Sequence, residues 1–132
     1  MSKNIINHVE FPVADAERSR HFYEAVLKPL GLSLVRSIEP TRTAHGGARH
    51  GFGRNGYPSL WVHEQKEARC PIHVALTADT HDGVRAFHVA ALANGGTENG
   101  GPGIRERYHA RYYAAYVLDP DGNNIEAVCQ TE

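Results

Sequence analysis

The sequence predicts a mixed α+β fold made of two tandem βαβββ modules in a single domain that covers residues 1–132. A stretch that begins at His8 recurs at His73 without a gap, which is about half of the chain later. Each copy passes from alternating apolar residues, typical of a strand, to apolar residues three and four apart, typical of a helix. We expect module one at about 4–66 and module two at about 70–131.

The two copies keep one register over a long stretch. Each places a phenylalanine fourteen residues after its histidine, at Phe22 and Phe87, and a glycine twenty-three residues after it, at Gly31 and Gly96. Agreement at several separate positions favours an internal duplication over coincidence, so both copies should fold alike.

Module one begins with a strand in which Val9, Phe11 and Val13 share one face. A helix should follow, with Asp15 as its N-cap and Gly31 at its end, because these residue types favour those positions. Three more strands are expected in "LSLVRSIE", near "ARHGFGR" and in "SLWVHE". The turn "GRNGYP" separates the last two.

Module two repeats this order, beginning with the strand "PIHVALTAD". Its helix should start at Thr80 or Asp82 and end at Gly95 and Gly96. A short strand near Thr97 and the strands "RYYAAYVL" and "NNIEAVC" should follow, with "DPDGNN" as the turn between the last two. The glycine-rich segment "NGGTENGGPGIRERYHA" predicts a mobile or substrate-facing loop.

Alternation along three strands points to a metal site. His73 and Glu126 each sit between apolar residues that face a helix, and His8 has the opposite parity to the apolar Val9, so all three should point to the opposite face. A buried carboxylate needs a partner, and water, an arginine or a metal ion could serve Glu126. Two neutral imidazoles and one carboxylate suit Fe(II), Mn(II) or Zn(II) and leave coordination positions open. The alternative is that each histidine is an ordinary hydrogen-bonded residue at a strand start.

These residues resemble the vicinal oxygen chelate superfamily, which contains glyoxalase I, extradiol dioxygenases, fosfomycin-resistance enzymes and bleomycin-binding proteins. The resemblance rests on "HVEFPVADAERSRHFYEAVLKPLGL", "IHVAL" and "DPDGNNIEAV", in this order along almost the whole chain. It implies a curled, eight-stranded mixed sheet around one divalent metal ion (Fe, Mn, Zn or Ni). It also implies that His8, His73 and Glu126 are the metal ligands and that the substrate carries vicinal oxygens.

The resemblance orders the possible reactions. Glyoxalase I has a fourth ligand, a glutamate in the last strand of its first module. Four residues after the turn glycine Gly56 this chain has Leu60, flanked by Ser59 and Trp61, and none of these is a carboxylate. We therefore expect dioxygenase-like chemistry first and glyoxalase-like or lyase-like chemistry second. The rival interpretation is a non-catalytic, bleomycin-type binding or resistance protein.

Further side chains are candidates for acid–base roles. Glu10 shares the parity of His8 and is a candidate general base or outer-shell partner of the metal; the alternative is a solvated or ion-paired glutamate. By resemblance to extradiol dioxygenases, His109, Tyr113 and Tyr116 are candidate acid–base groups. The arginines and tyrosines between Arg105 and Tyr113 suit a small anionic or aromatic substrate, or else a dimer interface.

Composition excludes several classes of partner. The formal net charge is −1, which argues against nucleic-acid binding. No apolar run approaches the roughly 20 residues that a spanning helix needs, and no secretory signal is evident at the N-terminus, so we expect a cytoplasmic protein without a membrane partner. The expected partner is a small-molecule substrate, and the resemblance implies a homodimer.

Overall fold

The computed structural model describes residues 5–44, 46–67 and 69–132; residues 1–4, the first of the predicted domain, lie outside this part, as do residues 45 and 68. The elements of module one and then of module two follow in chain order. They are β1 (Val9–Val13), α1 (Ala16–Leu27), the 3-10 turn η1 (Lys28–Leu30), β2 (Ser33–Ile38), the 3-10 turn η2 (Pro40–Arg42), β3 (Arg49–Arg54), β4 (Tyr57–Glu64), β5 (His73–Thr77), α2 (His81–Ala93), β6 (Thr97–Glu98), β7 (Gly103–Ile104), β8 (Tyr113–Leu118) and β9 (Asn124–Cys129).

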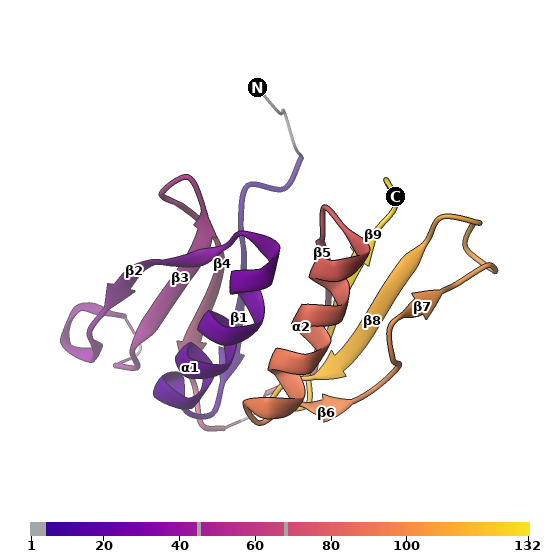
Figure 1. Ribbon diagram of the computed structural model, residues 1–132. Helices are drawn as coiled ribbons and strands as arrows, with labels where there is room; N and C mark the ends of the chain where they lie inside the picture. The colour runs from indigo at the N-terminus through magenta and orange to yellow at the C-terminus, as the bar shows by residue number, and fades with distance from the viewer. Residues whose placement is uncertain (1–4, 45, 68) are drawn as a thin grey trace.

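The strands form two sheets with the same internal order (Figure 1). The first sheet runs β1-β4-β3-β2, and the second runs β5-β9-β8-β6. β1 pairs with β4 in parallel and β5 pairs with β9 in parallel, whereas the other pairs are antiparallel. The predicted pair of βαβββ modules in an α+β fold is therefore confirmed.

One strand among the described residues was not predicted. The glycine-rich loop folds back along β8 and forms the two-residue strand β7, so nine strands are present where eight were expected. The backbone N–H of Arg105 donates to the carbonyl of Tyr112 at 2.7 Å, which closes this extra ribbon. Backbone hydrogen bonds order this segment, and it has no pattern of apolar residues. Because strands are predicted from such a pattern, this one could not be read from the sequence.

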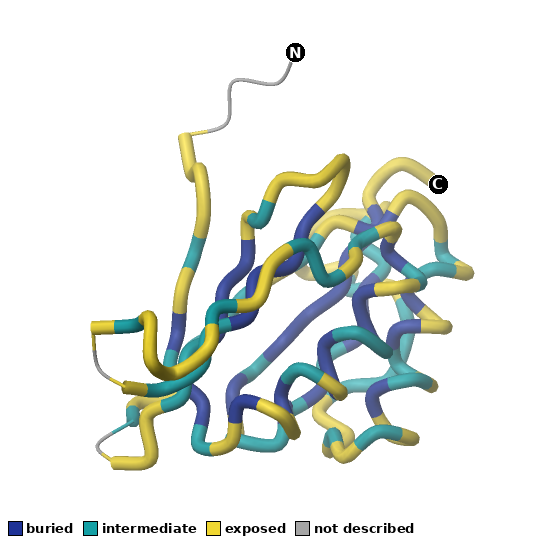
Figure 2. Tube along the Cα trace, turned by 90° about the vertical axis from the view of Figure 1, so that its left-hand side faces the viewer, coloured by how far each residue is buried: buried dark blue, intermediate teal, exposed yellow. Residues whose placement is uncertain are grey.

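Both helices lie on the same side of the two sheets and next to each other (Figure 1). The buried stretches of the chain lie where helices and strands meet, and the N-terminal segment is exposed (Figure 2). The core side chains come from both modules and include Phe11, Phe22, Tyr23, Phe52 and Phe87. Neither helix combines the length and apolar character that a membrane crossing requires within the described part of the chain.

The helix ends follow the predicted caps. The side chain of Asp15 accepts a hydrogen bond from the Arg18 backbone at 3.0 Å and starts α1. Of the two candidates in module two, Thr80 is the cap, because its hydroxyl accepts from the Gly83 backbone at 2.9 Å. Gly31, with φ of 79°, follows η1 in the left-handed conformation that glycine tolerates best.

The turn "DPDGNN" of module two forms hydrogen bonds and an ion pair with module one. The buried hydroxyl of Tyr23 on α1 donates to Asp119 at 2.5 Å. Burial, and then the charge of Asp119, raises the pKa of Tyr23 well above its ordinary value, so it stays a donor. Asp121 accepts from the Ala14 backbone at 2.8 Å and lies 3.4 Å from the Arg18 guanidinium. The strand that carries Glu126 therefore starts from an anchored turn.

Candidate metal and substrate site

The site lies on the face of the second sheet that points away from the helices. In the strand register Glu126 on β9 sits between Ala75 on β5 and Tyr116 on β8, while His73 sits beside Asn124. Because the alternate residues pack into the helix-covered core, these side chains share the open face. Glu126 is only 2% exposed, so its charge depends on the groups around it.

The histidine and the carboxylate face each other. His73 Nε2 lies 3.2 Å from a carboxylate oxygen of Glu126, and its Nδ1 lies 2.9 Å from the backbone carbonyl of Asn124. A carbonyl only accepts, so Nδ1 carries a proton, and a neutral imidazole then turns its Nε2 lone pair toward the carboxylate. Two acceptors at this distance need a second proton or a cation between them. A metal-binding histidine is commonly held in this way by a backbone carbonyl, so the pair fits a divalent ion.

Two tyrosines complete the surroundings of Glu126. The hydroxyl of Tyr112 donates to the second carboxylate oxygen at 2.5 Å. Burial and the neighbouring Glu126 raise the pKa of Tyr112 and of Tyr116, so both stay protonated hydrogen-bond donors. The ring of Tyr116 also stacks over His73 at a centroid distance of 6.4 Å. The tyrosines therefore supply hydrogen bonds but no countercharge.

A cavity of about 560 Å³ opens over this face, large enough for a small organic molecule. Its charged lining consists of two guanidinium groups and one carboxylate, besides His73. The lining residues are His73, Asn99, Gly100, Arg105, Arg107, Tyr108, Tyr112, Tyr116, Asn124 and Glu126. Half of them come from the loop that the sequence predicts to face a substrate.

The structure brings three of the predicted site residues together, namely His73, Glu126 and Tyr116. His8 precedes β1 in the other module, where it is exposed and its Nδ1 lies 2.8 Å from the Asn7 side-chain oxygen. In residues 5–44, 46–67 and 69–132 no three His, Cys, Asp or Glu side chains converge closely enough to hold a metal ion. Two of the three predicted ligands are thus adjacent, and the third lies on module one.

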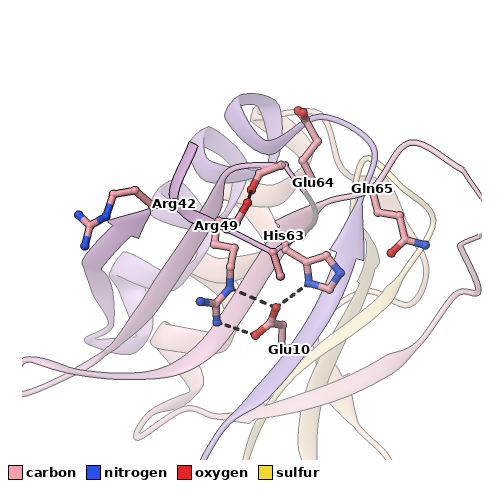
Figure 3. A pocket seen from close by; sticks show the side chains of 9 residues that line it. Glu10, Arg42, Arg49, His63, Glu64 and Gln65 are labelled. Carbon is pink, nitrogen blue, oxygen red and sulfur yellow. Dashed lines mark hydrogen bonds and ion pairs between the residues drawn. The ribbon is translucent and has the colours of Figure 1, made fainter. Parts of the chain in front are cut away.

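Glu10 lies in an ion-pair cluster on the open face of the first sheet, beside a cavity of about 340 Å³ (Figure 3). Its two oxygens lie 2.7 Å from Arg49 Nη2 and 2.7 Å from His63 Nδ1. Burial alone would raise the pKa of Glu10, but Arg49 and then His63 outweigh it and lower the pKa. A carboxylate so neutralised is a weak base, and it orients His63 instead.

The two other candidates lie elsewhere. Tyr113 is on the helix-facing side of β8. Its hydroxyl accepts a hydrogen bond from Arg85 at 3.0 Å, and its ring stacks on His81 at a centroid distance of 3.9 Å.

His109 Nε2 lies 2.6 Å from the side-chain oxygen of Gln130, and its Nδ1 accepts a hydrogen bond from the Arg111 backbone. Neither lines the cavity over Glu126.

Tyr112 was not among the predicted acid–base residues, although a signal for it exists. Alternation along "RYYAAYVL" puts Tyr112 and Tyr116 on one face and Tyr113 on the other. Because Tyr116 and Glu126 are paired across β8 and β9, that face is the one over the site. Sequence gives the parity but not the register between the strands, and only the register decides which tyrosine meets the carboxylate.

The register also corrects one equivalence between the modules. The sequence count from the turn glycine placed Leu60 at the position that matches Glu126, but Leu60 is buried in the core opposite Val9. Glu10 pairs with Trp61 as Ala75 pairs with Glu126, so Trp61 holds the matching place. The paired residues Gly51 and Trp61 are as far apart in sequence as Tyr116 and Glu126, but the turn glycine stands at a different place in each hairpin, which the count could not reveal. The conclusion that no carboxylate occupies this place in module one is unchanged.

Comparison with known proteins agrees with this architecture. A model of the Glyoxalase/Bleomycin resistance protein/Dioxygenase superfamily matches residues 5–127. A glyoxalase/bleomycin resistance protein from Albidiferax ferrireducens is 28% identical, with a TM-score of 0.74 over 96% of this chain and 98% of that one. A family enzyme from Burkholderia phytofirmans is 19% identical, with a TM-score of 0.68 over 95% of this chain and 98% of that one.

Glyoxalase I from Zea mays shares the fold at 23% identity and a TM-score of 0.68. The match covers 95% of this chain but only 46% of the maize chain, so this chain spans about half the length of that enzyme. No protein of curated function matches the sequence significantly.

Proposed function

Because the chain belongs to the Glyoxalase/Bleomycin resistance protein/Dioxygenase superfamily, we propose that it is a metal-dependent enzyme acting on a small molecule with vicinal oxygens. One divalent ion (Fe, Mn, Zn or Ni) is held by His73 and Glu126, with His8 as the third ligand. The observation that carries the proposal is the contact between His73 Nε2 and Glu126, two groups that need a second proton or a cation between them. The reaction is dioxygenase-like in the first place and glyoxalase-like or lyase-like in the second.

When bound, the metal would act as a Lewis acid toward the two vicinal oxygens of the substrate. The chain's own residues prepare the site. The Asn124 carbonyl fixes the ring of His73, and Tyr112 holds Glu126 in one orientation. Tyr116 carries a proton on the same face and is the side chain placed to donate a hydrogen bond to substrate oxygen. Glu10 orients His63 on the first sheet and takes no part in this site.

The homodimer belongs to the same proposal. β1 and β5 each form one edge of their sheets, and an apolar groove lies between these two strands. The exposed Ile5 and Ile6 precede β1. Exposed apolar surface beside open strand edges favours association with a second copy. His8 at this edge then completes the ligand set from its own chain or from that copy.

The second candidate function is a non-catalytic binding or resistance protein. It is favoured by one observation, which is that only two of the three predicted ligands lie together in the described residues. In such a protein the cavity over Glu126 would sequester a compound, and His73 would be the protonated partner of the carboxylate. Metal binding separates the two candidates.

The test is the metal content of protein purified without chelator, compared with the variant His73→Ala. We expect one bound ion per site in the wild type and its loss in His73→Ala. His21→Ala is the matched control, because His21 is an exposed histidine on α1, away from the site. Turnover of catechol with Fe(II) under oxygen, against the methylglyoxal–glutathione adduct with Ni(II) or Zn(II), then separates the two chemistries. Absence of stoichiometric metal together with unchanged metal uptake by His73→Ala would overturn the enzyme proposal.

A further inference from the structure

The cavity over Glu126 has an excess of positive charge. Arg105 and Arg107 line it against the single carboxylate of Glu126. A divalent ion at His73 and Glu126 would add two further positive charges, and a site of this kind attracts a ligand that carries negative charge of its own. The two arginines are not equivalent, however, because their surroundings differ.

The guanidinium of Arg105 is hydrogen-bonded within the protein. Its Nη1 donates to the Gly103 carbonyl at 3.1 Å and its Nη2 donates to the Gly101 carbonyl at 2.7 Å. The guanidinium also lies 5.3 Å over the ring of Tyr116. These contacts hold the glycine-rich loop against β8, so Arg105 is a positioning residue for the cavity wall.

Arg107 is left available. Its guanidinium lies 5.1 Å over the ring of Tyr108, and no residue in the described part of the chain accepts a hydrogen bond from it or pairs with it. A cavity-lining guanidinium with five unused donors is a ready partner for a carboxylate, which it can bind through two parallel hydrogen bonds.

An aromatic wall connects Arg107 to the metal-binding end of the cavity. The ring of Tyr108 lies 4.9 Å from the ring of Tyr112, and the hydroxyl of Tyr112 donates to Glu126. The wall therefore has a cation at one end and the carboxylate–histidine pair at the other. Flat tyrosine rings between two such ends suit a planar ring of similar size.

We propose that the substrate of this site is an aromatic acid. Its ring lies along Tyr108 and Tyr112, its vicinal oxygens face His73 and Glu126, and its carboxylate binds Arg107. The proposal rests on the function proposed above and deepens it, because it assigns the substrate class and names Arg107 as the residue that selects it.

The experiment measures the binding of three probes by calorimetry, namely 3,4-dihydroxybenzoate, catechol and benzoate. These carry both groups, the vicinal oxygens alone and the carboxylate alone. A charge-assisted pair contributes roughly tenfold or more in affinity, so the metal-loaded wild type should bind 3,4-dihydroxybenzoate at least about tenfold more tightly than catechol. Arg107→Ala should remove this preference, so that 3,4-dihydroxybenzoate and catechol bind with similar affinity.

Arg111→Ala is the matched control. Arg111 belongs to the same segment and carries the same charge, but its guanidinium donates to the Thr131 carbonyl and does not line the cavity. This variant should keep the preference, which excludes a general effect of net charge. An equal preference in Arg107→Ala and the wild type, or no preference in the wild type, would overturn the proposal.

Benzoate separates this inference from the proposed function. It lacks vicinal oxygens, so its binding to metal-free protein depends on Arg107 and not on the metal. Loss of benzoate binding in Arg107→Ala supports the aromatic-acid site even in protein that takes up no metal. Metal uptake with equal affinity for catechol and 3,4-dihydroxybenzoate instead supports the proposed function and refutes the assignment of Arg107.

Discussion

The open face of each sheet carries one strand carboxylate. In the first sheet it lies on the first strand of the module, and in the second sheet it lies on the last. In the first sheet β1 supplies Glu10, and its neighbour on β4 is Trp61. In the second sheet β5 supplies Ala75, and its neighbour on β9 is Glu126. The register of β1 on β4 matches that of β5 on β9, so at these positions the two sheets differ in their side chains.

The partners of the two carboxylates differ in charge. Glu10 is paired with Arg49, whose guanidinium also lies 4.2 Å over the ring of Trp61, and with His63. Glu126 is surrounded by the neutral hydroxyls of Tyr112 and Tyr116 and by His73. A carboxylate neutralised by a fixed arginine needs no ion, whereas one surrounded by neutral donors keeps its need for a cation. The comparison thus supports the proposal that the metal binds at the second sheet.

The turns that precede the two final strands differ in the same way. In module two the buried Asp119 accepts hydrogen bonds from the Tyr23 hydroxyl, from the Asp121 backbone, and from both the backbone and side chain of Asn123. In module one the exposed Arg54 only donates to the Leu30 carbonyl at 2.9 Å. The final strand that carries the proposed metal ligand therefore has the more rigid start.

The largest effect is expected from Glu126→Gln, which keeps the shape of the side chain and removes its charge. Loss of an outer-shell partner costs roughly 10–100-fold in metal affinity, and loss of a ligand itself should exceed that, so stoichiometric binding should disappear. Titration of a divalent ion followed by calorimetry measures this directly.

Glu10→Gln is the control from the first sheet. It should leave metal affinity unchanged and cost about 1 kcal/mol of folding stability, because Arg49 and His63 lose a partly exposed partner. A loss of metal binding in Glu10→Gln as large as that in Glu126→Gln would show that the two carboxylates serve one site, and the comparison would fail.

A smaller effect, on stability rather than binding, is expected for Asp119→Ala. The change leaves the buried Tyr23 hydroxyl and the Asn123 groups without an acceptor, which should cost about 3 kcal/mol. Arg54→Ala, at the turn of module one, should cost less than about 1 kcal/mol because that side chain is exposed. Urea unfolding gives both values from the midpoint at constant m. Similar costs for the two variants would mean that the turns anchor their strands equally.

Most of the fold could be predicted from the sequence because the duplication shows twice where each strand and helix lies. The helix caps Asp15 and Thr80 and the turns before β4 and β9 follow from local chemistry. The strand β7 could not be predicted, because two residues paired through backbone groups leave no apolar pattern.

The site was predictable only in part. Alternation is enough to place His73 and Glu126 on one face, and the structure shows them in contact. Alternation does not reveal ion pairs between strands that are distant in sequence, so the ion-paired alternative for Glu10 could be stated but its partner Arg49 could not be named. Nor does it reveal the register of β8 on β9, which decides that Tyr112 and not Tyr113 reaches Glu126.

The smallest effect concerns the helix-facing side of the first sheet, where His50 occupies the place that Ala115 holds in the second. His50 is buried beneath α1, and its Nδ1 lies 2.8 Å from the Ser37 hydroxyl. Burial, and then the charge of Arg20, lowers the pKa of His50 below its ordinary value of 6.5, although Glu17 and Glu24 act in the opposite direction. The folded protein therefore holds this imidazole neutral.

This neutral imidazole makes the folded state sensitive to acid. As the pH falls below 6.5, His50 becomes protonated in the unfolded chain but stays neutral in the folded protein. Folding stability therefore decreases until the pH reaches the lowered pKa of the folded state. His50→Ala should cost about 1–2 kcal/mol at pH 7.5, where the histidine only packs and bonds to Ser37. Its deficit should shrink as the pH falls from 7.5 to 5.5, because the variant has no such proton to exclude. Urea unfolding of both proteins across this pH range measures the stability deficit of the variant. A deficit that stays constant or widens as the pH falls would show that the folded protein accepts a proton at His50, and the prediction would then be wrong.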